Sequence, residues 1–331
     1  MSPRLTLALN GGGLLLPESG TIAVFHPRGD ADLTNLPMER TVVIQPMRPD
    51  HDALSGLGYH CVTDTDATTG RFAASLIYLP RSKAQARGMI AAAAALTDGP
   101  LIVEGQKTDG IDSLMRDVKK SAPLTGSLSK AHGKMFWLAA NSTDWAGWAT
   151  ESSQIAVDFI TVPGIFSADD IDPASKMLAD HLPEKLGKCV ADLGAGWGYL
   201  SARILERESV RRIHLVEADY TALNCARTNI TDTRAQFHWA DAMAWQSADK
   251  FDTVVMNPPF HIGRRADPAL GRAFIGAAAR LLVPSGQLWM VANRHLAYEA
   301  ALGEKFGDVQ EVAGDNRFKI LRGVRPIRPR R

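Results

Sequence analysis

Two short segments of this 331-residue chain combine residue types that can perform chemistry. One is the glycine-rich segment Asp192-Leu-Gly-Ala-Gly-Trp-Gly198, and the other is Asn257-Pro-Pro-Phe260. Glycines let a backbone turn tightly and approach a ligand closely. Two consecutive prolines hold the asparagine before them in a rigid, extended loop. The first segment therefore predicts a ligand-binding turn, and the second predicts hydrogen-bond acceptors in fixed positions.

The glycine-rich segment follows a strand-like run, Cys189–Leu193, and precedes a helix-like run, Tyr199–Arg207. Its spacing is not the G-x-G-x-x-G pattern of dinucleotide sites, because Tyr199 stands where the third glycine would be. An aspartate two residues before the first glycine would also fit a pyrophosphate badly. Asp192 suits the amino group of a ligand that carries an amino acid.

Two further acidic residues follow neighbouring strands. Glu217 ends the next predicted strand, where an acidic side chain suits the two hydroxyls of a ribose; the alternative is a solvated carboxylate at a strand end. Asp241 follows the third strand and is either an acceptor for an adenine amine or a helix cap. Together these features predict a pocket for S-adenosylmethionine, and its residues would be Asp192, Gly194, Ala195, Gly196, Gly198, Glu217 and Asp241.

The Asn-Pro-Pro-Phe segment suits a planar group with an exocyclic amine. The Asn257 side chain and the Pro258 carbonyl can accept hydrogen bonds from both protons of the amine, and Phe260 can stack on its plane. Such bonds favour the pyramidal amine that attacks carbon, so catalysis is mostly positioning and needs no strong base. We expect Asn257, Pro258, Pro259 and Phe260 to form the catalytic loop; alternatively, the prolines only end a strand.

Strand-like and helix-like runs alternate through the second half of the chain, which predicts βα units and a parallel sheet covered on both faces. The first half alternates less clearly. Its segment Leu76–Pro80 echoes Val254–Pro259, since each is followed by a helical run and another strand. The echo suggests a duplication in which only the second copy kept its loop chemistry.

Together the motifs resemble class I S-adenosylmethionine-dependent methyltransferases that act on exocyclic nitrogens. The closer resemblance is to the bacterial ribosomal RNA guanine-N2 methyltransferases of the RsmC type, over roughly residues 70–325. It is carried by Ile77–Lys83, Pro163–Ser167 with Asp172, the glycine-rich turn, Asn257–His261, Val291–Arg294 with Tyr298 and Glu299, and Asn316–Lys319. The chain departs from that pattern at Ile262.

The resemblance implies an α/β fold of two tandem class I methyltransferase-like (Rossmann-like) domains, the second with a seven-stranded mixed sheet. Residues 1–155 would form a degenerate domain without a cofactor site that binds RNA and stabilises its neighbour. Residues 156–331 would form the catalytic domain, with Phe166 as a further cofactor contact. The implied reaction is methylation of N2 of a guanosine in ribosomal RNA, expected to be 16S. The expected RNA contacts are Arg264, Arg265, Arg294, Arg317 and Lys319.

Composition limits the alternatives. The chain has 37 Lys and Arg against 36 Asp and Glu, which excludes a generally polybasic coat protein but allows local basic patches. Its last sixteen residues hold seven Lys and Arg and no acid, a pattern typical either of phosphate contacts or of a solvated terminus. Three widely spaced cysteines, no metal-ligand motif and no long apolar run lead us to expect a cytoplasmic monomer without metal or membrane contact.

Three other functions remain open from the sequence: an N6-adenine nucleic-acid methyltransferase, a protein-glutamine N-methyltransferase, and an RNA-binding scaffold with a vestigial cofactor pocket. The first two use the same asparagine-proline loop. The expected partner under the main prediction is ribosomal RNA or the small ribosomal subunit.

Overall fold

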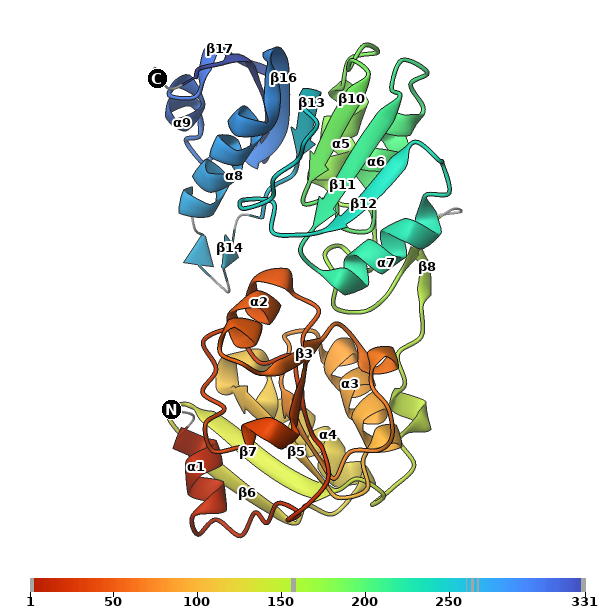
Figure 1. Ribbon diagram of the computed structural model, residues 1–331, viewed down its shortest axis with the longest axis vertical. Helices are drawn as coiled ribbons and strands as arrows, with labels where there is room; N and C mark the ends of the chain where they lie inside the picture. The colour runs from red at the N-terminus through yellow and green to blue at the C-terminus, as the bar shows by residue number, and fades with distance from the viewer. Residues whose placement is uncertain (1–2, 156–158, 260, 263–264, 267, 329–331) are drawn as a thin grey trace. The chain divides into compact units, whose positions relative to one another are not determined.

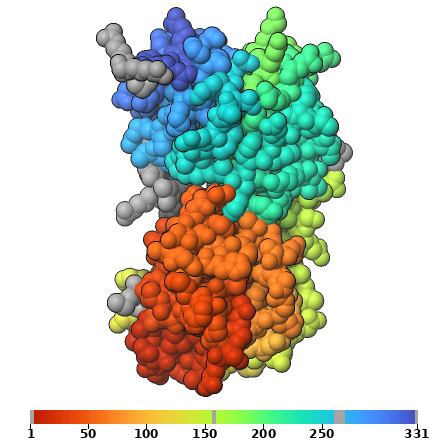
Figure 2. Space-filling model, in the orientation of Figure 1, coloured from red at the N-terminus to blue at the C-terminus, as the bar shows by residue number. Residues whose placement is uncertain are grey.

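The computed structural model describes residues 3–155, 159–259, 261–262, 265–266 and 268–328 (Figure 1). It divides into two compact units, each described here by itself. The first comprises Met1–Ser152 with Val162–Gly164, and the second Ser153–Thr161 with Ile165–Arg331. Residue 155, the boundary drawn from the sequence, lies in the segment where the chain passes between them. Figure 2 colours the first unit red to yellow-green and the second green to blue.

The first unit is a seven-stranded sheet with helices on its faces. Its helices are α1 (Pro3–Leu9), α2 (Arg48–Gly56), α3 (Lys83–Leu96) and α4 (Ile111–Ser121), with short 3-10 turns η1 (Met38–Arg40), η2 (Thr65–Ala67), η3 (Lys107–Asp109) and η4 (Ala146–Trp148). Its strands are β1 (Ile22–Phe25), β2 (Thr41–Ile44), β3 (His60–Val62), β4 (Ala74–Tyr78), β5 (Pro100–Gln106), β6 (Gly126–Lys130) and β7 (Gly133–Ala139).

The second unit repeats this plan. Its helices are α5 (Pro173–His181), α6 (Tyr199–Leu205), α7 (Tyr220–Asn229), α8 (Pro268–Leu281) and α9 (Glu299–Gly303). Its main sheet contains β10 (Cys189–Leu193), β11 (Arg212–Glu217), β12 (Ala235–Trp239), β13 (Phe251–Met256), β16 (Leu282–Asn293), β17 (Phe306–Gly314) and β18 (Phe318–Pro326). Two short hairpins add β8 (Ser153–Ile155) with β9 (Phe159–Thr161), and β14 (His261–Ile262) with β15 (Arg265–Ala266).

The two main sheets have the same topology. Their strand orders are β3-β2-β1-β4-β5-β7-β6 and β12-β11-β10-β13-β16-β18-β17. In each sheet the first five strands are parallel and the last two pairings are antiparallel. The five parallel strands of each sheet therefore come from alternating βα units, as expected. The predicted α/β fold with tandem Rossmann-like sheets, the second of seven mixed strands, is confirmed.

Apolar cores cover both faces of each sheet. In the second unit, α8 packs on β13 and β16 through buried residues such as Ile275, Val254 and Met290. In the first, α3 and α4 cover one face of the sheet and α1 covers the other. The tryptophan-rich stretch from β7 to η4 contributes to both cores of this unit, where Trp137 in β7 and Trp145 after it are buried.

The structure corrects the sequence prediction near the C-terminus. The sequence pattern predicts a helix over 296–306 and a strand over 309–312. In the structure the helix is limited to α9, and the strand extends through all of β17 because it pairs with β18 along its length. Strand β18 continues to Pro326, and the Arg328 guanidinium donates to the Ala279 carbonyl oxygen at 3.1 Å. The chain between 324 and 328 is therefore part of the fold and not a solvated terminus.

A buried ion pair fastens α1 to the first sheet. Arg4 Nε and Nη2 lie 3.0 and 2.8 Å from Glu104 Oε1 on β5, and Arg4 Nη1 donates to the Lys130 carbonyl oxygen at 2.9 Å. The two charged side chains are almost inaccessible to water. Such a pair depends on both partners, because either charge alone would be left buried.

We predict that Glu104→Ala lowers the free energy of unfolding by about 3–5 kcal/mol, since it leaves the Arg4 guanidinium buried without its carboxylate. Urea denaturation followed by circular dichroism measures this loss. The matched control is Asp98→Ala, which breaks the exposed pair with Arg71 and should cost less than about 1 kcal/mol. Equal losses in the two variants would contradict the anchoring role of Glu104.

Candidate active site

The site forms where β10, β11 and β13 end at one edge of the second sheet. Parallel pairing aligns Leu193 with Val216 on one side and with Met256 on the other. The residues that come next are Gly194, Glu217 and Asn257. The register therefore brings the glycine-rich turn, the acidic strand end and the Asn-Pro-Pro loop to one place, at the edge where open α/β sheets bind ligands.

The glycines of the turn adopt left-handed backbone conformations, with φ of 78° at Gly194, 55° at Gly196 and 96° at Gly198. A β-carbon at Gly196 would meet no protein atom within 4 Å, so that glycine borders open space. A β-carbon at Gly198 would lie 2.7 Å from Cδ1 of Ile230, so that glycine lets the turn pack against its neighbour. Gly196 therefore leaves room beside the backbone where a ligand could lie, and Gly198 allows close packing.

Asp192 presents a carboxylate to this turn from within the sheet. The residue is fully buried, and its Oδ2 accepts a hydrogen bond from Ser201 Oγ at 2.7 Å. Its Oδ1 is buried and has no hydrogen-bond partner among the described residues. Burial raises the pKa of the Asp192 carboxyl to about 7. An unpartnered buried acceptor of this kind suits a cationic ligand group.

Glu217 is tied to the turn and is not a freely solvated strand end. Its Oε2 accepts from the Gly196 N–H, and its Oε1 accepts from the Asp219 N–H, both at 2.8 Å. Burial raises the pKa of the Glu217 carboxyl to about 7. Asp241 Oδ1 accepts from the Met243 N–H at 2.9 Å, within a turn between β12 and β13, and no helix follows it in residues 240–250 for it to cap. Its contact with an adenine amine stays a prediction.

A pocket joins the predicted cofactor residues to the predicted catalytic loop. Its walls are formed by Phe166, Ser167, Asp172, Ser175, Gly194, Ala195, Gly196, Trp197, Tyr199, Leu200 and Asn257. Phe166 is 60% exposed at its border, and Ala195 is buried in the wall. The segments at 166, 194–197 and 257, far apart in the chain, therefore share one cavity, while Asp192 is buried behind the turn and does not line it.

Asn257 is held firmly at this pocket. Its Nδ2 donates to Asp172 Oδ2 at 2.9 Å and to Ser175 Oγ at 2.8 Å. Its Oδ1 is buried and has no hydrogen-bond partner in the described part of the chain. Pro258 is buried and Pro259 is exposed, so the loop turns outward there. Phe260 lies outside the described residues.

The expected RNA contacts have different surroundings. Arg317 is exposed and its guanidinium lies 4.8 Å from the ring centre of Phe318. Arg294 pairs with Glu311 at 2.9 Å and also donates to the Asp315 carbonyl oxygen. Lys319 is 5% exposed and its Nζ lies 2.5 Å from Glu299 Oε1, so its charge is used inside the protein and we leave it out of the RNA surface.

Two of the expected RNA contacts, Arg264 and Arg265, follow the catalytic loop. Arg264 lies outside the described residues, and only the backbone of Arg265, in β15, is described. Their contact with RNA stays a prediction.

Sequence reasoning missed the residues that support the site. Ser201 on α6 bonds to Asp192, and Asn229 on α7 donates from Nδ2 to the Trp197 carbonyl oxygen at 2.9 Å. Asp172 and Ser175, at the start of α5, hold the Asn257 amide, a role that the sequence pattern alone does not indicate. The Asp172-Pro173 pair, a common start of a helix, was a signal for the capping role of Asp172.

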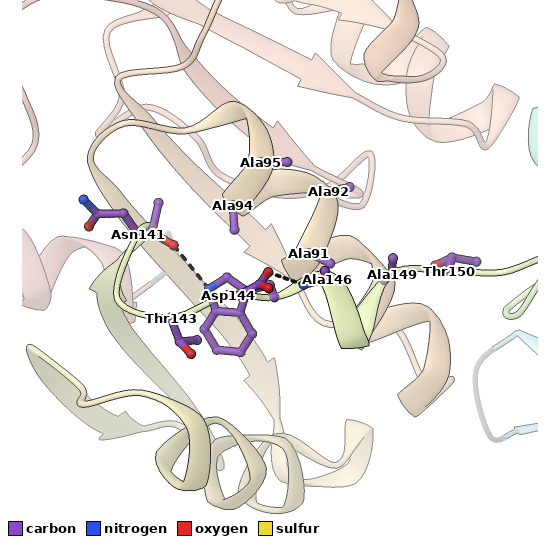
Figure 3. A pocket seen from close by; sticks show the side chains of 13 residues that line it. Ala91, Ala92, Ala94, Ala95, Asn141, Thr143, Asp144, Ala146, Ala149 and Thr150 are labelled. Atoms are coloured by element: carbon purple, nitrogen blue, oxygen red, sulfur yellow. Dashed lines mark hydrogen bonds between the residues drawn. The ribbon is translucent and has the colours of Figure 1, made fainter.

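A larger hollow in the first unit, of about 560 Å³, has a different character (Figure 3). Alanines of α3 and the segment 140–150 form its walls. Asp144 Oδ1 accepts from the Ala146 N–H at 2.9 Å, and Trp145 Nε1 donates to the Ala140 carbonyl oxygen at 3.2 Å. These polar groups are engaged locally, so the chemistry concentrates at the edge of the second sheet.

The residues at that edge fit S-adenosylmethionine. The unpartnered Asp192 Oδ1 suits the ammonium of its amino-acid part, and the open space beside Gly196 leaves room for a ligand against the backbone. Glu217 stands where a ribose would be held. No group of three His, Cys, Asp or Glu side chains that could hold a metal ion occurs within the described ranges. In the same ranges, every helix is too short or too polar to cross a membrane.

Comparisons with known proteins identify the family of the chain. The family model described as "Methyltransferase small domain" matches residues 156–322. The chain is 30% identical to ribosomal RNA small subunit methyltransferase C of Shewanella halifaxensis, over 76% of each chain. It is 34% identical to ribosomal RNA large subunit methyltransferase G of Alcanivorax borkumensis, over 48% of this chain and 42% of that one.

A solved structure shares the fold of both units. It is the 16S rRNA N2 G1207 methyltransferase (RsmC) of T. thermophilus, in complex with AdoMet and guanosine. The match has a TM-score of 0.77 with 24% sequence identity, and covers 95% of this chain and 90% of that one.

We predict that affinity for S-adenosylmethionine falls as the pH drops through about 7, because Asp192 and Glu217 must be ionised to bind it. Isothermal titration between pH 6 and 8.5 should show affinity rising with pH and then levelling. Asp192→Asn should lower the affinity and remove the part of its pH dependence that comes from Asp192. Glu217→Gln should remove the remaining pH dependence. A pH-independent affinity of the unsubstituted protein would contradict this.

Proposed function

Because this chain belongs to the ribosomal RNA small subunit methyltransferase C family, we propose that it methylates the exocyclic N2 amine of a guanosine in 16S ribosomal RNA. Family membership makes it an S-adenosylmethionine-dependent methyltransferase. The structural observation that carries the choice of an amine as target is the unpartnered, buried Oδ1 of Asn257, which lies at the same pocket as the glycine-rich turn.

The catalytic loop acts on the target amine by accepting its protons. Asn257 Oδ1 and the Pro258 carbonyl oxygen each accept one hydrogen bond, which draws the nitrogen lone pair out of conjugation with the ring. Bound S-adenosylmethionine supplies a methyl group already activated by its sulfonium. With the cofactor bound, its methyl group would pass to the amine nitrogen, S-adenosylhomocysteine would leave, and the proton lost by the amine would be released to water. Alignment of nitrogen and methyl group does most of the catalytic work.

An exposed basic and aromatic hollow supports an RNA substrate. It is lined by Asn293, Arg294, His295, Asn316, Arg317 and Phe318. Strand β16 runs parallel to β13, with Met290 beside Met256, so these residues follow the same edge of the sheet as Asn257. A guanidinium can neutralise a phosphate, and an aromatic ring can stack on an unpaired base. We propose that this hollow holds RNA that flanks the flipped guanosine.

The remaining parts of the proposal concern partners and domains. The first unit contributes RNA binding and stability, and the protein acts as a cytoplasmic monomer on ribosomal RNA or on the small subunit. S-adenosylmethionine is the cofactor, and the reaction as proposed needs no metal.

We predict that Asn257→Ala lowers kcat about 100- to 1,000-fold, because it removes one of two acceptors for the reacting amine. The dissociation constant for S-adenosylmethionine should stay within about twofold of the original, since Asn257 is not assigned to the cofactor. Tritium transfer to 16S RNA and to small subunits, followed by nucleoside mass spectrometry, measures both rate and product.

The product identifies the function. N2-methylguanosine that depends on Asn257 supports the proposal. N6-methyladenosine as the product would contradict the proposal and indicate an adenine methyltransferase. Methylated glutamine in protein would contradict it and indicate a protein-glutamine methyltransferase. Cofactor binding without any transfer would indicate an RNA-binding scaffold.

We predict that Arg317→Ala weakens RNA binding several-fold and lowers the slope of log affinity against log salt by about 1, as the loss of one phosphate contact requires. Filter binding with a 16S fragment at several salt concentrations measures this. Arg203→Ala, which breaks an exposed pair with Glu206 on α6, is the control and should leave the slope unchanged. An unchanged slope for Arg317→Ala would remove that residue from the RNA surface.

A further inference from the structure

The amide of Asn257 has two possible orientations, and only one suits the proposed reaction. Rotation of the side-chain amide by 180° exchanges its oxygen, which accepts hydrogen bonds, with its nitrogen, which donates them. An amine in the act of methylation must meet the oxygen. The proposed function therefore requires some feature of the protein to fix this orientation.

Two acceptors on the start of α5 face the amide nitrogen. Asp172 Oδ2 lies 2.9 Å from Asn257 Nδ2, and Ser175 Oγ lies 2.8 Å from it. A carboxylate has no proton to donate, so the reverse orientation would bring the Asn257 oxygen against the Asp172 oxygen. Two bonds also use both protons of Nδ2, which leaves Oδ1 as the group that is free to act on a substrate.

The same carboxylate oxygen is itself held in place. Asp172 is the N-cap of α5, and its Oδ2 accepts from the Ser175 N–H at 2.7 Å. Pro173 occupies the first position of the helix, where its fixed φ favours the helical start. Ser175 is 7% exposed, so its hydroxyl has little competition from water. The helix cap therefore provides a rigid support for the asparagine.

From this geometry we propose that Asp172 and Ser175 are positioning residues, which set the orientation of the Asn257 amide so that its oxygen faces the target amine. The proposal rests on the proposed function, since it assigns the reacting group to Asn257. It goes further by making the cap of α5 part of the catalytic apparatus, through contacts with Asn257 and not with the substrate.

The structure suggests variants that separate positioning from helix capping. Asp172→Ser keeps an N-cap acceptor, because serine caps helices well, but its shorter side chain cannot reach the amide in the same way. Ser175→Ala keeps the backbone N–H that Asp172 caps and removes only the hydroxyl. Asp172→Asn keeps an oxygen that the Ser175 N–H orients toward Asn257. Asp180→Ser, on the same helix but paired with exposed Lys176, is the control.

The expected rates follow from the number of bonds lost. At saturating RNA and S-adenosylmethionine, Asp172→Ser and Ser175→Ala should each lower kcat about tenfold, the effect of one hydrogen bond. Asp172→Asn should retain most of the rate, and Asp180→Ser should match the unsubstituted enzyme. The dissociation constant for S-adenosylmethionine should stay within about twofold in all four.

A double-mutant cycle tests whether the two residues act through Asn257. In an Asn257→Ala background, Asp172→Ser and Ser175→Ala should have no further effect on kcat, because no amide remains to be oriented. A spectroscopic measurement adds an independent readout. The side-chain NH2 resonances of Asn257, assigned by their loss in Asn257→Ala, should show slow exchange with water that becomes fast in Asp172→Ser.

Each outcome bears on one proposal or on both. Full activity of Asn257→Ala would overturn the proposed function and this inference together. Loss in Asn257→Ala, with unchanged kcat and NH2 exchange in Asp172→Ser and Ser175→Ala, would overturn the positioning role alone. Weaker S-adenosylmethionine binding with unchanged kcat would also overturn it and make Asp172 a cofactor ligand. Equal further losses in the Asn257→Ala background would show an effect that does not pass through the amide.

Discussion

The parallel pairing of β10 with β11 and β13 is the constraint on which the site depends. A shift of this register by one residue would move the side chains of β10 to the opposite face of the sheet and displace the turn at Gly194 from Glu217 and Asn257. With Leu193 beside Met256, the chain leaves both strands at the same level, and the turn at Gly194 meets the loop at Asn257. The cofactor residues and the amine acceptor are therefore neighbours because of backbone pairing, before any side-chain contact forms.

The first unit has the same strand pairing at the corresponding edge of its sheet, but different side chains there. His26 N–H donates to the Ile44 carbonyl oxygen at 2.9 Å, the counterpart of the bond from Gly194 to Val216, and His26 shares the left-handed backbone of that glycine. By register, Val24 stands where the second sheet has Asp192, and Tyr78 stands where it has Asn257. The edge is reproduced while its side-chain chemistry differs, as the sequence echo suggested.

The sequence predicted those parts of the site that make demands on the backbone. The pattern predicts the turn from its glycines at 194, 196 and 198, and the rigid loop from its prolines at 258 and 259. Few other residues adopt these backbone conformations. Ser201, Ser175 and Asn229 could not be predicted, since their roles depend on helices that approach the turn only in the folded unit. Lys319 shows the opposite error: a basic residue in an RNA-like motif is buried against Glu299, and charge alone does not reveal burial.

The buried carboxylates at the turn connect stability with ligand binding. Asp192 Oδ1 lies in the core without a partner, a cost that a well-packed apolar side chain would avoid. Under the proposed function, a cationic ligand group bound there would supply the missing partner and so stabilise the folded unit. Glu217 differs, since backbone N–H groups already hold both its oxygens and fix its direction. Under the proposed function, Asp192 would contribute to the affinity through its unpartnered oxygen, and Glu217 through the conformation of the turn whose Gly196 N–H it accepts.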